Sequence, residues 1–112
     1  MKTTATLEGD VKIIILNGKI LSSQDTADMH IQVRTALEQN IKKVVLDLSG
    51  LDWTGSTGLG ALVAVQGRLR NVDGHLKLAG VNPTVGELLK LNKLNLVFEM
   101  YPTVAEAVAH FK

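Results

Sequence analysis

The chain has 112 residues, of which 46% are hydrophobic and 21% charged, proportions typical of a globular domain and not of a disordered segment. Twelve Lys and Arg against eleven Asp and Glu leave a net charge of +1, which gives no overall attraction to nucleic acid or to an acidic membrane surface. The absence of cysteine excludes disulfides and thiolate metal sites. We therefore predict one domain spanning residues 1–112, with no nucleic-acid partner and no cofactor.

The hydrophobic segments are short. Residues 1–10 contain no apolar run of the kind found in a signal peptide. The longest apolar runs, residues 13–16 and 61–65, are far too short to cross a bilayer. These observations predict a cytoplasmic protein without direct membrane insertion.

The predicted elements alternate between strands and helices along the chain. Residues 4–10 are predicted to form an edge strand, and Val11 to Asn17 a second strand that Gly18 ends. A helix runs from the capping residues 22–25 to about Asn40, followed by a strand over residues 43–48 and a loop over 49–55. The remaining elements are a helix over 57–72, a strand over 75–79, a helix from Pro83, a short strand over 96–100 and a helix from Pro102.

The strands alternate between apolar and polar residues, which predicts the architecture. Val44, Leu46 and Leu48 share one face of their strand, as do Leu76 and Leu78. The opposite positions include charged or titratable residues that a second helical layer would bury, namely Lys12, Asp47, His75 and Lys77. We therefore predict an α/β fold with a mixed sheet, helices mainly on one face and a more open second face.

Residues 47–60 are the most informative segment. A strand leads through a short loop into a helix that begins at Ser56-Thr57, where unpaired backbone N–H groups create a partial positive charge. After Asp52 the next acidic residue is Asp73, so the first turn of this helix lacks the usual acid. A phosphate on Ser56 would suit this position. An N-cap role for Ser56 fits the same spacing.

The helix after Ser56 is apolar on more than one face. Leu59, Leu62, Leu69 and Val72 can face the sheet, while Ala61 and residues 63–65 leave apolar surface elsewhere. Such a helix is either enclosed in its own domain or docks a partner, whose backbone Gly58, Gly60 and Gly67 would let approach closely. Neither a Walker motif nor Gly-x-Gly-x-x-Gly is present, and the three histidines lie in separate elements without metal-ligand spacing. Trp53 fits either a core position or a contact position.

The segment resembles the STAS family, and more narrowly its anti-sigma factor antagonists. The resemblance rests on Asp47-Leu48-Ser49-Gly50 followed by Ser56-Thr57-Gly58-Leu59-Gly60, and the order of elements matches along nearly the whole chain. It implies a single STAS domain that acts by binding and is not an enzyme. In this family the serine at the helix start is phosphorylated by a partner anti-sigma factor, which is a serine kinase. The unmodified form binds that partner and frees the sigma factor, and a metal-dependent protein serine phosphatase restores it.

Carried over by position, the resemblance makes Ser56 the phosphoacceptor, with Thr57 the less favoured alternative. The implied partner-binding residues are Trp53, Thr54, Gly55, Ser56, Thr57, Gly58, Leu59, Gly60 and Val63. The family often has Asp before the phosphorylated serine, whereas this chain has Gly55, so the loop lacks a carboxylate that could bond to the helix start.

Two other functions remain open at this point. A STAS subunit of another assembly, such as a lipid-transport complex or a stressosome-like scaffold, would dock a permanent partner through the same helix without phosphorylation. A small enzyme or nucleotide-binding protein ranks last, because no constellation of catalytic groups stands out.

Overall fold

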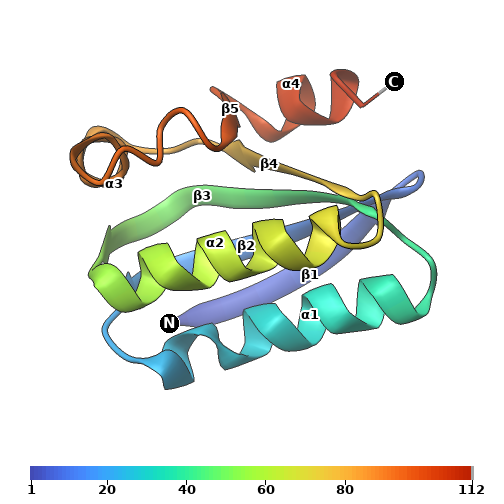
Figure 1. The fold of residues 1–112 in the computed structure, drawn as a ribbon, viewed down its shortest axis with the longest axis horizontal. Coiled ribbons are helices and arrows are strands. Elements are labelled where there is room, and N and C mark those ends of the chain that lie inside the picture. Colours follow the sequence, from blue (N-terminus) through green and yellow to red (C-terminus); the bar gives the residue numbers. More distant parts are fainter. Residues whose placement is uncertain (112) are drawn as a thin grey trace.

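Five strands form one mixed sheet in the computed structural model, which describes residues 1–111 (Figure 1). The strands follow the chain order across the sheet: β1 (Lys2–Glu8), β2 (Val11–Ile20), β3 (Lys43–Thr54), β4 (His75–Ala79) and β5 (Glu99–Tyr101). β1 is antiparallel to β2, and the pairs from β2 to β5 are parallel. The helical elements are η1 (Ser23–Thr26), α1 (Ala27–Glu38), α2 (Ser56–Arg70), α3 (Pro83–Leu91) and α4 (Val104–Ala109). The predicted mixed sheet is confirmed.

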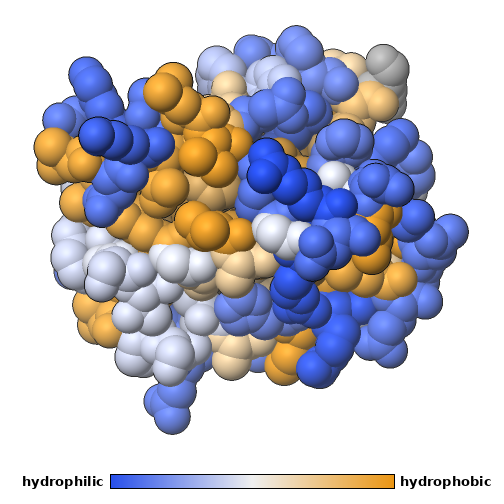
Figure 2. All heavy atoms as spheres, viewed as in Figure 1, coloured by the Kyte–Doolittle hydropathy of each residue, from blue (hydrophilic) through white to orange (hydrophobic). Residues whose placement is uncertain are grey.

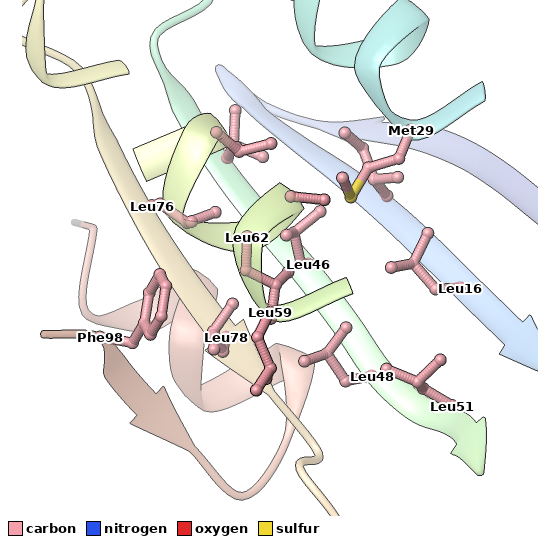
Figure 3. Packing of buried hydrophobic residues seen from close by; sticks show 14 of the residues in the cluster. Leu16, Met29, Leu46, Leu48, Leu51, Leu59, Leu62, Leu76, Leu78 and Phe98 are labelled. Carbon is pink, nitrogen blue, oxygen red and sulfur yellow. The ribbon is translucent and has the colours of Figure 1, made fainter. Parts of the chain in front are cut away.

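The larger core lies between the sheet and α1, α2 and α3. The register pairs Val44 with Leu76 and Leu46 with Leu78, so the predicted apolar positions share one face. Figure 3 shows Leu59 and Leu62 of α2 pointing into this cluster. Met29 and Val33 of α1 and Val85 and Leu89 of α3 complete it. Three of the four α-helices in residues 1–111 therefore cover the same face, as the alternation predicts.

Among the described residues, α4 is the one helix that covers the second face, over a smaller cluster. Val11, Ile13, Val45 and Ala79 of the sheet pack there with Ala107 and Val108. Thr103 caps α4 by accepting a hydrogen bond from the amide of Glu106 at 3.2 Å.

The charged residues of the strands are distributed between the two faces of the sheet differently from the prediction. Lys12 pairs with Val44, so it lies on the face of the larger core and not with Asp47, His75 and Lys77. Lys77 does lie on the second face, but α4 and the chain around it bury this residue. Its Nζ lies 2.8 Å from Glu99 Oε2 and 4.6 Å from the centroid of the Phe111 ring. A buried lysine is tolerated there because it has both an ion pair and aromatic contacts.

β2 and β3 are longer than predicted, and this difference shapes the site. Gly18 does not end β2: it adopts φ +108° at an irregularity in the β2–β3 register, and the strand continues to Ile20. β3 in turn continues past Leu48 to Thr54, because Gly18, Lys19 and Ile20 supply partners for Leu51, Trp53 and Thr54. The glycine and serine residues predicted a loop over 49–55, but strand pairing overrides that local preference.

Several other helix and strand boundaries differ from the predicted ones. The predicted edge strand lies two residues earlier, and the helix after it begins as η1 and ends at Glu38. The last strand is Glu99–Tyr101, so Leu96 and Val97 lie in the preceding turn and are exposed. Within residues 1–111 no helix has the length and apolar character needed to cross a membrane.

Candidate partner-binding site

The connection between β3 and α2 is a single residue. Gly55 is the N-cap of α2, with extended backbone (φ −95°, ψ −166°), and it has no side chain with which to cap the helix. Ser56 is therefore the first helical residue, and the predicted N-cap role for it is wrong.

The first turn of α2 leaves two backbone amides open. The amides of Gly58 and Leu59 donate to the Gly55 carbonyl at 3.1 and 3.3 Å, whereas those of Ser56 and Thr57 have no acceptor within residues 1–111. The Ser56 side chain is exposed, and its hydroxyl makes no hydrogen bond in the same part of the chain. No acidic residue lies in this turn. The helix start thus combines a free hydroxyl with unpaired N–H groups and uncompensated positive potential.

Gly58 fixes where α2 begins relative to β3. A Cβ added at Gly58 would overlap the Thr54 hydroxyl and would lie 3.0 Å from both Thr54 Cβ and Ile20 Cδ1. Thr54 is fully buried and donates its hydroxyl to the Gly55 carbonyl at 3.1 Å. The absence of a side chain at Gly58 therefore allows the helix to approach the ends of β2 and β3 closely. This contact holds Ser56 close to the carboxyl end of β3, the central strand.

The Asp47-to-Gly50 motif has a structural role at the point where β3 loses β4 as a neighbour. The β3–β4 register ends at Asp47 and Ala79. Immediately beyond it, Asp47 Oδ1 accepts hydrogen bonds from both the amide and the hydroxyl of Ser49, at 3.0 and 2.7 Å. A side chain at Gly50 would collide with Asn17, so this glycine admits the irregular stretch of β2.

Asn82 then ties the extension of β3 to α3. Its Nδ2 donates to the Leu51 carbonyl at 2.7 Å, and its Oδ1 accepts from the Val85 amide at 2.8 Å as the N-cap of α3. The sequence interpretation did not identify Asn82, although Asn before Pro83 is a recognisable capping signal.

The structure divides the nine predicted partner-binding residues by exposure. Trp53, Ser56, Thr57, Gly60 and Val63 are exposed, and Gly55 is half-buried. Thr54, Gly58 and Leu59 are buried, so in this structure they support the site from below and do not form its surface.

The exposed side of α2 forms a stripe of small and apolar residues. We call it the α2 surface and define it as Ser56, Thr57, Gly60, Val63, Ala64 and Gly67. A Cβ added at Gly60 or Gly67 would meet no heavy atom within 4 Å, so both glycines face open space. Val63 is 42% exposed, whereas Val65 is fully buried. The alternative that α2 is enclosed within its own domain is therefore wrong for this side of the helix.

The turn before β5 extends the α2 surface. Gln66 Nε2 donates to the Val97 carbonyl at 2.8 Å, which holds this turn beside α2. Leu96 and Val97 are both exposed, Leu96 to 87%. Figure 2 shows weakly polar residues over the start of α2 and hydrophobic residues gathered between α2 and α3. The sequence interpretation missed this extension because it placed both residues in a strand.

The titratable residues do not form a metal-binding cluster in the part of the chain that the structure describes. No group of three or more His, Asp or Glu side chains in residues 1–111 could hold a metal ion. His30 lies on α1, His75 begins β4 and His110 follows α4. Burial, and secondarily the positive charge of Arg68, hold the pKa of His30 below its usual value of 6.5. The arrangement offers a binding surface and a free hydroxyl.

Comparison with known proteins agrees with this architecture. A family model described as the STAS domain matches residues 3–107. The chain is 29% identical over all 112 residues to BtrV of Bordetella bronchiseptica, which bears the name of an anti-sigma factor antagonist, and it covers 96% of that protein.

Solved structures show the same fold over nearly the whole chain. The crystal structure of a Thermotoga maritima protein, also named for the anti-sigma factor antagonists, has a TM-score of 0.85 and 25% identity, with 96% of this chain and 92% of that chain covered. The Bacillus cell fate determinant SpoIIAA, solved in its phosphorylated form, has a TM-score of 0.77 and 18% identity, with 99% and 100% covered. The chain therefore belongs to the STAS-domain family, and relatives matched over its full length are named anti-sigma factor antagonists.

Proposed function

We propose that this protein is an anti-sigma factor antagonist, a protein-binding switch that sequesters an anti-sigma factor serine kinase and so releases a sigma factor. The observation that carries the proposal is the position of Ser56: an exposed, unbonded hydroxyl at the start of α2, at one end of an apolar surface. The full-length match to BtrV supports the same class of partner.

Phosphorylation at Ser56 would change binding far more than folding. A phosphoryl group adds roughly −1.5 to −2 charge units at neutral pH. The free amides of Ser56 and Thr57 and the positive end of α2 can stabilise that charge while the surface remains in water. A partner docked on the α2 surface would have to desolvate the same dianion. The modification should therefore weaken the complex and leave the protein folded.

Gly55 fits this switch because it leaves the amides available. With Gly55 at this position, neither a side-chain cap nor a competing charge is present. We propose that the phosphate itself provides the cap in the modified form.

Any anti-sigma factor serine kinase encoded beside this protein's gene would serve as the reagent that tests the proposal. We expect ATP and the kinase to phosphorylate Ser56, as mapped by mass spectrometry, and the modified protein to lose affinity in calorimetry. Ser56→Ala should bind and resist modification, at a cost in stability well below 1 kcal/mol because Ser56 is not the N-cap. Thr84→Ala removes an exposed hydroxyl from the first turn of α3, outside the α2 surface; it is the matched control and should behave like the parent. A phosphate found only away from residues 56 and 57, or a Ser56→Asp variant that binds as tightly as the parent, contradicts the switch.

The same experiment addresses the alternative function. A partner that binds the α2 surface stably while no kinase modifies Ser56 would favour a STAS subunit of another assembly. In that case Val63 would still contribute to the contact, but Ser56→Asp would have only a local effect.

A further inference from the structure

The two edges of the sheet differ in how they are protected. β5, at one edge, has three residues, and the chain continues from it into α4, which packs beside it on the second face. β1, at the other edge, has seven residues, and its register with β2 runs without a bulge from Lys2–Asn17 to Glu8–Val11. It contains no proline and no inward-pointing charge among its central residues. A long, regular edge of this kind is a template for another strand.

The hairpin geometry tells which backbone groups of β1 are unpaired. The register closes on the Glu8–Val11 pair around a two-residue turn in which Gly9 has φ +63°. The two residues that flank such a turn form a hydrogen-bonded pair, and hydrogen-bonded and non-hydrogen-bonded pairs then alternate along the antiparallel strands. The amides and carbonyls of Thr3, Ala5 and Leu7 therefore point away from β2. These three residues present three donors and three acceptors along the edge.

The sequence of β1 is complementary to itself in the antiparallel direction. If Ala5 of one copy lies opposite Ala5 of a second copy, Lys2 lies opposite Glu8, Thr3 opposite Leu7 and Thr4 opposite Thr6. Opposite charges then meet at both ends of the junction. Leu7, half exposed in the single chain, gains contact with the methyl group of Thr3 in the second copy.

The same register also pairs the backbone amides and carbonyls of β1 that point away from β2. An Ala5–Ala5 pair that exchanges two hydrogen bonds makes both Thr3–Leu7 pairs hydrogen-bonded as well, which uses all six outward groups of each copy. The helices also allow this register. α1 packs beneath β1 and β2, so the α1 axes of the two copies would be separated by two strand spacings, about 10 Å, the usual distance between packed helices.

We infer that β1 pairs with β1 of a second copy of this chain about a two-fold axis at Ala5, giving a dimer with one continuous sheet. The α2 surface lies on α2, the helix that follows β3, and β2 separates β3 from β1, so each copy keeps its own partner-binding site. The junction involves one strand per copy, which is small for an interface, and we expect a Kd of roughly 10–1000 µM.

Exchange of the two charges tests the register. Sedimentation equilibrium of the unmodified protein at up to about 1 mM should show dimers. Lys2→Glu and Glu8→Lys each place like charges at both ends of the junction and should raise the Kd about tenfold at low salt. The double variant Lys2→Glu/Glu8→Lys restores both pairs and should return the Kd to the parent value. Lys42→Glu, an equal charge change at an exposed position outside β1, is the control and should leave the Kd unchanged.

Cysteine substitution gives a second, independent test because the chain has no cysteine of its own. Only residue 5 meets its own copy across the axis, at a Cα separation of about 5.5 Å that a disulfide can bridge. Mild oxidation should cross-link Ala5→Cys and leave Thr4→Cys, which faces Thr6 of the second copy, uncross-linked. A protein that stays monomeric at about 1 mM, a charge exchange that does not restore dimerisation, or equal cross-linking of both cysteine variants overturns the proposal.

Discussion

A methyl group added at Gly58 should disrupt the start of α2, whereas one added at Gly60 should strengthen it. Both glycines lie in the first turns of the same helix, so each change to Ala gains helix propensity of about 1 kcal/mol. At Gly60 the new methyl group meets open space. At Gly58 it overlaps the Thr54 hydroxyl, and Thr54 Cβ at 3.0 Å is too close to the backbone to move away freely.

The size of the effect follows from these contacts. Overpacking of a tight buried site costs about 1–3 kcal/mol, and a clash with atoms near the backbone should lie toward the upper end. After the gain in propensity, Gly58→Ala should destabilise the protein by about 2 kcal/mol. Gly60→Ala should stabilise it by up to about 1 kcal/mol. The two variants should therefore differ by about 3 kcal/mol, or roughly 13 °C in Tm for a domain of this size.

Urea and thermal unfolding followed by circular dichroism will measure this difference. Thr54→Ala should rescue Gly58→Ala in part, because it removes the hydroxyl that the new side chain overlaps, while Thr54 Cβ and Ile20 Cδ1 remain close. A coupling free energy of about 1 kcal/mol or more between the two sites is expected for residues in contact. Equal stability of Gly58→Ala and Gly60→Ala would refute the close packing between α2 and the end of β3.

Three further predictions concern the binding surface, the second face and pH. Val63→Asp should abolish detectable partner binding in calorimetry, because it should cost about 2–5 kcal/mol of binding free energy, with little change in the stability of the fold. Val72→Asp, at a similarly exposed valine beyond the end of α2, is the control and should bind normally. Lys77→Met should leave the free energy of unfolding unchanged or raise it, since an apolar side chain of similar volume replaces a buried charge. Glu99→Gln should lower the free energy of unfolding by about 1 kcal/mol, because it leaves the charge of Lys77 unpaired. Equal effects of the two changes in urea unfolding would argue against a role for Glu99 in pairing the buried lysine. The lowered pKa of His30 means that the folded protein binds a proton less readily than the unfolded chain, so stability should fall as the pH drops below the usual value of 6.5. Arg68→Gln should raise the pKa of His30 in an NMR titration and reduce that loss, and an unchanged pKa would show that the guanidinium does not act on His30.

The sequence predicts the layered part of the fold well because one-sided burial leaves a period-two signal. Val44, Leu46 and Leu48 belong to one face in both the prediction and the structure. The same reasoning fails where pairing partners decide the outcome. Ser49 and Gly50 favour a loop by composition, but the extension of β2 pairs with this segment and makes it a strand.

The sequence predicts where the candidate site lies but not which of its residues are exposed and which are packed against the sheet. The Ser56-to-Gly60 motif identifies the start of α2, and Val63 lies on its exposed side. The roles of the glycines depend on distances between elements that no local pattern contains. Gly58 admits the hydroxyl of Thr54, while Gly60 two residues later faces open space. Likewise Lys12 appears equivalent to Lys77 in the sequence, and only the β2–β3 register places it on the opposite face.

Asn82 supplies a hydrogen bond to β3 where the neighbouring strand β4 no longer pairs with it. Beyond Asp47 the extension of β3 is hydrogen-bonded to β2 on one side and has no β4 partner on the other. The amide group of Asn82 satisfies the Leu51 carbonyl on that open side and at the same time caps α3. Local unfolding should therefore divide β3 into two parts, with hydrogen exchange slow for residues 43–47 and faster for residues 48–54. The segment that carries Ser56 would open together with the start of α3, so the mobility of the switch is set by a side chain from a different element.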